Sequence, residues 1–262
     1  MKISILISSY NKGAYIDECL QSCLNQTYRD FEIILLDNYS NDNTDSVLNK
    51  YYKDITIKKE LKVSNYSAVN QIDLLKKAFL ISHGEVVCFL DADDLFEENK
   101  LMNINKVFSQ NNKTNIIFDK PKILIGNNTH KFKLKKKLSK YVWPTTHPTS
   151  SLSIKRSFLK TLFENETFKS YPLLEIDFRI TSLSKMIYKD FIIVNEKLTT
   201  YRKVSDGIMS KSKFFSKTWW IKRLQAHYFI NDIFMKNKKI YKRTYDFYFT
   251  KFIVNFLNNN LK

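Results

Sequence analysis

The sequence predicts an α/β fold, in which a mostly parallel sheet is covered by helices on both faces. One observation is that short apolar runs alternate with amphipathic segments through the first hundred residues. Another is that 44% of the 262 residues are hydrophobic, which is enough for one large domain or two small ones. A third is that polar clusters follow three of the runs, at 8–11, 37–40 and 91–94. Because ligands bind beyond the carboxyl ends of such strands, we expect the three clusters to form one site.

The expected elements alternate regularly along the amino-terminal half. A strand is expected where apolar residues run together, and a helix where they recur every three or four positions. The strands are placed at residues 3–7, 31–36, 55–63 and 85–90. The helices are placed at residues 16–24, 40–52, 72–82 and 96–108. Further along, residues 153–162 are expected to form the end of a strand and then a helix.

Three aspartates, Asp91, Asp93 and Asp94, lie within four positions directly after the fourth expected strand. Because side chains alternate along an extended backbone, Asp91 and Asp93 should point the same way. Two carboxylates on one side can hold a hard divalent cation, with water and phosphate oxygens completing its shell. The alternative is that Asp93 or Asp94 caps the amino terminus of the helix expected at 96–108.

Four ordered blocks, at residues 5–11, 24–37, 40–44 and 83–94, resemble the family 2 glycosyltransferases of the GT-A fold. The resemblance implies an inverting, metal-dependent enzyme of bacterial surface-polysaccharide synthesis, such as capsule or lipopolysaccharide. Such an enzyme moves a sugar from a nucleoside-diphosphate sugar, most often a UDP-sugar, with Mn or Mg as the cofactor. Its acceptor would be a hydroxyl of a glycan or of a lipid-linked sugar.

The same resemblance assigns roles to single residues. Asp91 and Asp93 would be the acidic DXD motif that holds the metal. The residues that would bind the nucleotide sugar are Ser9, Tyr10, Asn11, Asp37, Asp91, Ala92 and Arg202. Ser9, Tyr10 and Asp37 in particular would border the base and the ribose. Arg202 closes a Leu-x-x-Tyr-Arg segment and could reach the diphosphate, because a guanidinium suits phosphate geometry; an ordinary surface arginine is the alternative.

The chain departs from the family pattern at three places, the first of which is Ser8, where a proline is usual. The usual acidic pair followed by Gly-Ser is Asp37-Asn38-Tyr39-Ser40 here, so Tyr39 stands where a glycine is usual. The family's Arg-Asn ahead of the fourth strand is not evident, and Lys76 or Lys77 is the candidate replacement. These changes bear on which donor is bound more than on the reaction class.

An acidic block at residues 173–179 resembles the segment that supplies the family's general base. The acceptor hydroxyl must lose its proton as it attacks the anomeric carbon, so a base is required. Either Glu175 or Asp177 can serve, and we favour Asp177 because it directly precedes the residues that open a helix. The alternative is that Asp177 is only a charge at the helix start, partnered by Arg179.

The positive charge is unevenly distributed. Lys and Arg number 43 against 26 Asp and Glu, a net charge of +17, and the excess lies at residues 131–140 and beyond 211. In the second region lysines mix with aromatic residues, a pattern typical of helices at an anionic membrane surface. A helical lid packed on the domain is the competing interpretation. No RNA-binding motif is present, so no nucleic-acid partner is expected.

We therefore expect a glycosyltransferase domain at 1–205, with the nucleotide-sugar half at 1–110 and the acceptor and catalytic half at 111–205. A basic, aromatic-rich helical extension is expected at 206–262. Two other functions remain open: a non-catalytic nucleotide-sugar or glycan-binding module on the same fold, and sugar transfer to polyprenyl phosphate. Three cysteines and no long apolar stretch favour a cytoplasmic protein, with a peripheral position on the inner membrane as an option. His147 is the candidate histidine of an acceptor loop.

Overall fold

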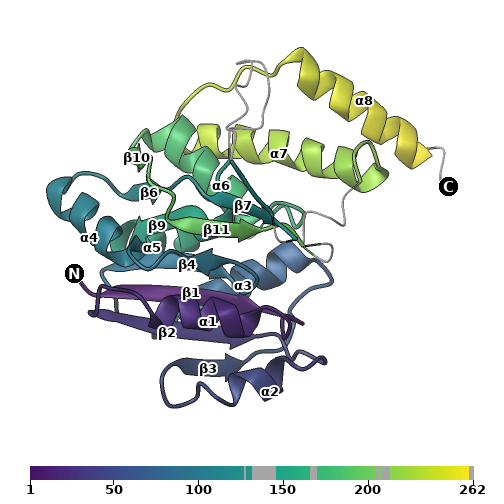
Figure 1. The fold of residues 1–262 in the computed structure, drawn as a ribbon. Helices are drawn as coiled ribbons and strands as arrows, with labels where there is room; N and C mark the ends of the chain where they lie inside the picture. The colour runs from purple at the N-terminus through teal and green to yellow at the C-terminus, as the bar shows by residue number, and fades with distance from the viewer. Residues whose placement is uncertain (127, 132–145, 166–169, 205–206, 208–212, 260–262) are drawn as a thin grey trace.

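The computed structural model describes residues 1–262 except 127, 132–145, 166–169, 205–206, 208–212 and 260–262. Its centre is a seven-stranded sheet in the order β10-β6-β9-β4-β1-β2-β3 (Figure 1). The strands are β1 (Ile3–Ser9), β2 (Phe31–Asp37), β3 (Thr56–Lys59), β4 (Val86–Asp91), β6 (Ile116–Phe118), β9 (Leu152–Lys155) and β10 (Phe191–Ile193). All neighbours pair in parallel except β9, which runs antiparallel to β4 and β6. The predicted α/β fold is confirmed.

The register of the central strands explains why the polar clusters meet. β1 pairs in parallel with both β2 and β4. Ser9 lies beside Asp37, and Ser8 lies beside Asp91. Because the three strands end together, the residues that follow them share one edge of the sheet.

A smaller four-stranded sheet lies beside this edge. It consists of β5 (Leu95–Phe96), β11 (Thr199–Arg202), β7 (Lys122–Ile125) and β8 (Asn128–Lys131), paired in that order. β5 directly follows the acidic cluster, and β11 pairs with it antiparallel. The pairing brings Tyr201 and Arg202 to the acidic cluster although they lie about a hundred residues further along the chain.

Helices cover both faces of the large sheet. They are α1 (Ile16–Leu24), α2 (Thr44–Leu48), α3 (Ser67–Ile81), α4 (Lys100–Gln110), α5 (Arg156–Glu164), α6 (Ile176–Ser182), α7 (Lys217–Lys236) and α8 (Tyr245–Asn259). A 3₁₀ turn (Thr149–Ser151) precedes β9, and a π-helical turn (Leu183–Tyr188) follows α6. α7 lies across the domain and α8 packs against it on the outside (Figure 1).

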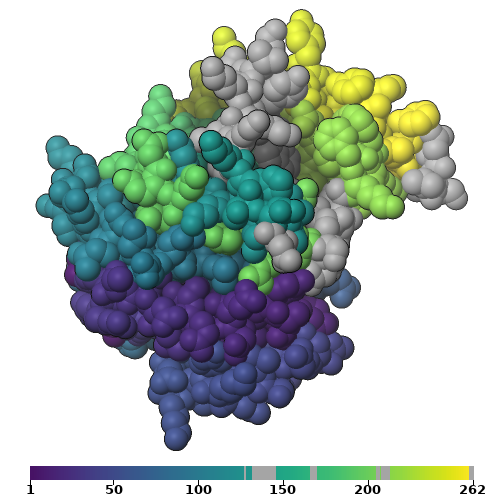
Figure 2. Space-filling view, viewed as in Figure 1, coloured from purple at the N-terminus to yellow at the C-terminus, as the bar shows by residue number. Residues whose placement is uncertain are grey.

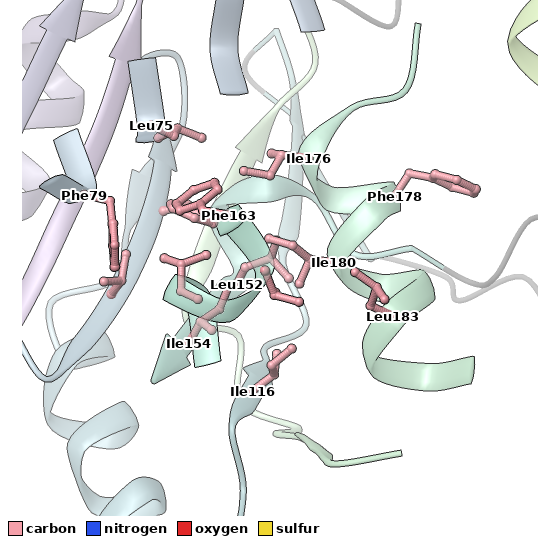
Figure 3. Close-up of a cluster of buried hydrophobic side chains, with 14 of the residues drawn as sticks. Leu75, Phe79, Ile116, Leu152, Ile154, Phe163, Ile176, Phe178, Ile180 and Leu183 are labelled. Carbon is pink, nitrogen blue, oxygen red and sulfur yellow. The ribbon is translucent and has the colours of Figure 1, made fainter. Parts of the chain in front are cut away.

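Two buried apolar clusters lie on opposite faces of the sheet, because strand side chains alternate. Ile3, Ile5 and Ile7 of β1 join one cluster, and Leu6 joins the other. Figure 3 shows part of the second cluster, in which β9, α5 and α6 meet. α7 contributes to the same cluster with Ala226, Phe229, Ile230 and Ile233. The carboxy-terminal helices are therefore built into the core of the domain through α7.

Several expected boundaries differ from the observed ones. Within the strand expected at 55–63, only the residues of β3 form a strand, and within the helix expected at 40–52 only those of α2 are helical. α3 begins five residues before the helix expected at 72–82. The expectation that Asp93 or Asp94 caps the following helix was wrong, because α4 begins at Lys100 and its N-cap residue is Asn99. Most of the basic run at 131–140 lies outside the described residues.

Candidate active site

A cavity of about 760 Å³ opens at the carboxyl edge of the central strands. Its walls come from the segments after β1 and β2, from α3, from the acidic cluster, and from residues ahead of α6 and at the end of β11. Of the residues predicted from the sequence, Ser9, Tyr10, Asn11, Asp91, Ala92, Asp93, Glu175, Asp177 and Arg202 line it. The structure thus brings both predicted halves of the site into one cavity.

The turn after β1 forms one wall. Ser9 is nearly buried, and its Oγ has no hydrogen-bond partner among the described residues. The ring of Tyr10 is 39% exposed, and the Lys62 ammonium lies 3.2 Å from its centroid. The half-exposed aromatic ring of Tyr10 suits a nucleoside, since it can stack on a base.

Asp37 holds this wall from behind. It is fully buried, and its two carboxylate oxygens accept hydrogen bonds from the Ser40 backbone N–H (2.7 Å) and Oγ (2.6 Å). Ser40 Oγ in turn accepts a bond from the Asn11 backbone N–H at 2.7 Å. Among the described residues, the neighbouring Asn38 lines the cavity and Asp37 does not. Asp37 therefore shapes the turn, and its predicted contact with the nucleotide stays a prediction.

Tyr39 adopts the left-handed backbone conformation, with φ of 50°. Glycine reaches this region without strain, which explains in physical terms why a glycine is usual at this position. The Tyr39 side chain is 53% exposed, and the Lys59 ammonium lies 5.8 Å from its ring centroid. The substitution therefore leaves the turn intact and adds an aromatic ring outside it.

Asp91 is the first member of the acidic cluster and is half-buried. One carboxylate oxygen accepts a hydrogen bond from Gln71 Nε2 at 2.7 Å, and the Asp91 backbone N–H donates to Ser150 Oγ at 3.0 Å. Burial and the negative charges of Asp93 and Asp177 raise the pKa of Asp91 to about 7. Asp177 also lines the cavity, and its negative charge is the third cause of this rise in the pKa, after burial and the charge of Asp93.

Asp93 has a cation beside it. The Lys12 ammonium lies 2.9 Å from an oxygen of the Asp93 carboxylate, and both side chains are largely buried. Among the described residues, no three His, Cys, Asp or Glu side chains are grouped to hold a metal ion. Asp91 and Asp93 can nevertheless supply two hard oxygen ligands from one wall, and their buried negative charge favours a cation there. The residues present therefore fit a divalent ion whose remaining ligands come from a diphosphate and water.

Asp94 has a supporting role. It is fully buried and accepts hydrogen bonds from Ser150 Oγ at 2.5 Å and from the Arg202 backbone N–H at 2.7 Å. Burial first, and then the charges of Asp91 and Asp93, raise the pKa of Asp94 well above its usual range. Its bonds tie the acidic cluster to the strand β11 and to the turn that carries Ser150.

The opposite wall carries both candidate bases. Asp177 lies in the first turn of α6, and its carboxylate accepts a hydrogen bond from the Phe178 backbone N–H at 2.7 Å. Burial and the charge of Glu175 raise the pKa of Asp177 to about 7, against smaller lowering effects that include the Lys222 charge. Glu175 precedes the helix, and its carboxylate forms an ion pair with Lys222 of α7.

Three other expectations have different outcomes in the structure. The Arg202 guanidinium pairs with Glu18 at 2.5 Å, while the residue also lines the cavity. Neither Lys76 nor Lys77 lines the cavity: Lys76 donates to the Phe163 carbonyl, and Lys77 pairs with Glu60 and Asp73. His147 is buried against the Asp119 carbonyl, and burial lowers its pKa to about 4, so it is not an exposed acceptor-loop histidine.

Four residues of the site were missed by the sequence reasoning: Lys12, Gln71, Ser150 and Lys222. Lys12 directly follows the recognised block at 5–11, so its position next to Asn11 was a usable signal. Gln71 faces the cavity because α3 begins earlier than expected. Nothing in the sequence around Ser150 or Lys222 indicates that either contacts an acid far away in the chain.

The sheet, its covering helices and the acidic cluster at its carboxyl edge are the architecture of GT-A glycosyltransferases. The family model described as glycosyl transferase family 2 matches residues 4–170, which is more than half of the chain. The chain therefore belongs to the family 2 glycosyltransferases.

Relatives and solved structures agree with this assignment. Poly(ribitol-phosphate) β-N-acetylglucosaminyltransferase TarP of Staphylococcus aureus is 35% identical over 120 residues, covering 44% of this chain and 36% of TarP. The structure of S. aureus TarS with UDP-GlcNAc matches 88% of this chain and 67% of that chain, with a TM-score of 0.66 and 18% identity. A mannosyltransferase of Pyrobaculum calidifontis in complex with GDP-Man and Mn²⁺ matches 94% of this chain and 66% of that one, with a TM-score of 0.57 and 17% identity.

At such identities the two solved structures show that the fold is shared. The chain spans between 21% and 55% of the lengths of four curated relatives that it matches, TarP included. The helices that the structure describes include none long and apolar enough to cross a membrane. The three cysteines, Cys19, Cys23 and Cys88, are free and buried.

Proposed function

We propose that this glycosyltransferase transfers a sugar, with inversion, from a UDP-sugar to a hydroxyl group of a cell-surface glycan. The observation that carries the proposal is the convergence of Asp91, Asp93 and Asp177 on one cavity of about 760 Å³. That volume is in the range of pockets that take small ligands. Acids on two facing walls allow the donor diphosphate to bind on one side and the attacking hydroxyl on the other.

On the donor wall, Asp91 and Asp93 would hold a Mn or Mg ion together with the diphosphate. When bound, such an ion offsets the negative charge of the leaving nucleoside diphosphate. Lys12 supplies a further positive charge at the same place, since its ammonium lies 2.9 Å from Asp93. Ser9 and Tyr10, which line the cavity, would contact the nucleoside.

On the acceptor wall, Asp177 is proposed as the general base. Its carboxylate takes the proton of the acceptor hydroxyl as the oxygen attacks the anomeric carbon from the side opposite the diphosphate. A pKa of about 7 suits this role, because the group is partly ionised near neutral pH and still basic enough to accept a proton. Glu175 is less suitable, because its charge is already engaged by Lys222.

The cell-surface acceptor is proposed from relatives. TarP and a poly(ribitol-phosphate) β-glucosyltransferase of Bacillus spizizenii are named for a phosphate-bearing polymer. The net charge of +17 is compatible with a negatively charged acceptor or membrane near the enzyme. A cytoplasmic site of action at the inner face of the membrane, where a growing glycan would be found, is part of the proposal.

The test of the donor wall is a thermal-shift screen of UDP, GDP and TDP, each with and without Mn. We expect UDP with Mn to raise the Tm most, and Asp93→Ala to lose this metal-dependent rise together with transfer. Asp54→Ala is the matched control, because Asp54 is an exposed aspartate outside the cavity. Full transfer activity in Asp93→Ala would overturn the assignment.

Product formation distinguishes the proposed enzyme from the rival function, a non-catalytic binding module. The enzyme should release free UDP when a polymer acceptor such as poly(ribitol phosphate) is added to UDP-GlcNAc, and a binding module should not. Binding of UDP without any release, across glycan and polyprenyl-phosphate acceptors and several UDP-sugars, would favour the module. Release with polyprenyl phosphate alone would redirect the acceptor assignment.

The carboxy-terminal helices support the proposed position at an anionic membrane. One face of α8 carries Tyr245, Tyr248, Phe249, Phe252 and Phe256, all at least 57% exposed. These positions recur at helical spacing and define the aromatic face of α8. The residues that α8 buries, Phe247, Thr250 and Val254, lie on its other side. α8 itself lies on the outside of the molecule (Figures 1 and 2).

The aromatic face continues beyond α8. The rings of Trp220 and Phe249 lie 5.8 Å apart, and Trp219 and Trp220 lead on to the exposed Phe214 and Phe215. Residues 206–262 also contain twelve Lys and Arg against three Asp. Aromatic rings within a basic surface suit the interface of an anionic bilayer, where each basic residue contributes about 1 kcal/mol.

Flotation with vesicles tests this position. The protein should float with vesicles of phosphatidylcholine and phosphatidylglycerol, should bind pure phosphatidylcholine weakly, and should dissociate in high salt. Phe252→Ser with Phe256→Ser should abolish flotation, whereas Leu80→Ser should not, because Leu80 is an exposed apolar residue of α3. Equal flotation with charged and uncharged vesicles, unchanged in high salt, would overturn the membrane assignment.

A further inference from the structure

Lys222 connects the carboxy-terminal helices to the acceptor wall of the cavity. It lies on α7, and its ammonium forms an ion pair with the carboxylate of Glu175. The two side chains are only 8% and 11% exposed. Because both groups have given up most of their hydration, the pair persists only if the surrounding packing holds it in place.

That packing is provided by α7 itself. Ala226 and Phe229 lie one and two turns beyond Lys222 and are fully buried in the core cluster. The ring of Phe229 packs against Phe178, which follows Asp177 on α6. The packing of α7 against α6 therefore holds the Lys222 ammonium beside the Glu175 carboxylate.

The ion pair matters because Glu175 and Asp177 lie two positions apart at the start of one helix. Two neighbouring carboxylates compete for one proton unless a cation neutralises one of them. The negative charge of Glu175 raises the pKa of Asp177, and the positive charge of Lys222 lowers it. The Lys222 ammonium therefore offsets part of the repulsion that the Glu175 carboxylate exerts on the Asp177 carboxylate.

We propose that Lys222 is a positioning residue for sugar transfer: by neutralising Glu175 it leaves Asp177 as the carboxylate that accepts the proton of the acceptor. The inference rests on the proposed function, which makes Asp177 the base. It adds that the carboxy-terminal helices take part in the chemistry of the site.

Charged and titratable groups face Asp177 from every side. The groups whose charges act on it or respond to it are Glu175 ahead of α6, Lys222 on α7, Asp91 at the end of β4, and Tyr201 on β11. Arg179, on α6 itself, donates to the carbonyls of Leu174, Ser170 and Tyr171. Within this set, Glu175 is paired with a cation from another helix, Lys222 of α7. The charge of Lys222 is therefore the one that the experiment varies.

The experiment follows the side-chain carboxyl ¹³C signal of Asp177 through a pH titration of the full chain, with the spectrum of Asp177→Asn assigning the signal. We expect Lys222→Gln to raise the pKa of Asp177 by about one unit. Lys222→Arg keeps the charge and should restore a value close to that of the parent protein. An unchanged pKa in Lys222→Gln, or equal shifts in the Gln and Arg variants, would overturn the inference.

A second pair of variants removes Glu175, and its double member removes both charges of the buried pair, so that neither is left there without its partner. Glu175→Gln should lower the pKa of Asp177, and Glu175→Gln combined with Lys222→Gln should raise it again relative to the single variant. Equal values in the single and the double variant would contradict the inference even if Lys222→Gln alone does not fold.

Activity then separates this inference from the proposed function. In Lys222→Gln the acid limb of the kcat profile should move to higher pH by the same amount as the pKa, so the loss of rate is about tenfold at pH 6 and small at pH 9. A fully active Asp177→Asn would refute the base assignment and leave the titration result standing. An inactive Asp177→Asn with an unmoved limb in Lys222→Gln would refute only the role of Lys222.

Discussion

Asp177→Asn is expected to abolish transfer and at the same time to stabilise the folded protein. Burial and the charge of Glu175 raise the pKa of Asp177 from its ordinary 3.8 to about 7. At about 1.4 kcal/mol per pKa unit, this difference means that the ionised carboxylate costs the folded state about 4 kcal/mol. Asparagine has no charge to bury, and its Oδ1 can still accept the bond from the Phe178 backbone N–H.

The cost depends on pH in a direction that follows from proton linkage. The unfolded chain loses the Asp177 proton near pH 3.8, and the folded protein retains it up to about pH 7. The destabilisation is therefore absent below pH 3.8, grows between pH 3.8 and 7, and is fully present above pH 7. At pH 5 it amounts to roughly a third of its full value.

Thermal unfolding at two pH values measures this effect. Each kcal/mol shifts the Tm of a domain of this size by about 2–4 °C, so Asp177→Asn should unfold about 8 °C higher than the parent protein at pH 8. At pH 5 the gain should be about 3 °C. Asp54→Asn is the control, because this aspartate is exposed and its replacement should leave the Tm unchanged.

Transfer should fall by about 10²–10⁴-fold in the same variant, because the acceptor hydroxyl loses its base. A lower Tm at pH 8, or a gain that does not change with pH, would refute the electrostatic reasoning. Normal turnover would refute the role of Asp177 as the base.

Three further predictions concern other parts of the chain. Lys12→Gln removes the ammonium beside Asp93, so calorimetry should show that Mn²⁺ binds to the donor-free protein about tenfold more tightly. Unchanged binding would show that Lys12 does not compete with the metal ion for this carboxylate. Lys100→Met leaves Asp119 charged and without its cation in the fully buried pair, so denaturant unfolding should report a loss of about 3–5 kcal/mol; a loss below 1 kcal/mol would contradict this account. Tyr39→Gly removes a side chain from a left-handed residue and should raise the free energy of unfolding by up to about 1 kcal/mol, whereas a clear loss would mean that the ring contributes to the turn.

Much of the fold could be predicted because apolar runs record the strands directly. β1, β2 and β4 were placed within two residues, since each is buried on both faces. α2 and α3 were placed less well, because residues such as Asn70 and Gln71 are polar and yet nearly buried, which hides the helical period. Aromatic residues occur on more than one side of α8, so their spacing alone does not indicate which of them face α7.

The candidate site, like the fold, was predictable from the sequence only in part. The sequence by itself determined that Ser9, Asp91 and Asp93 meet, because residues that follow parallel strands in register share one edge of a sheet. Only the tertiary structure decided which charges are paired: Lys12 with Asp93, and Lys222 with Glu175 from 47 positions away. It also decided that Asp37 supports a turn and that Asp177 lies half-buried at the cavity. The physical reason is that a pKa and an ion pair depend on burial and distance, which arise only when helices distant in the chain pack together.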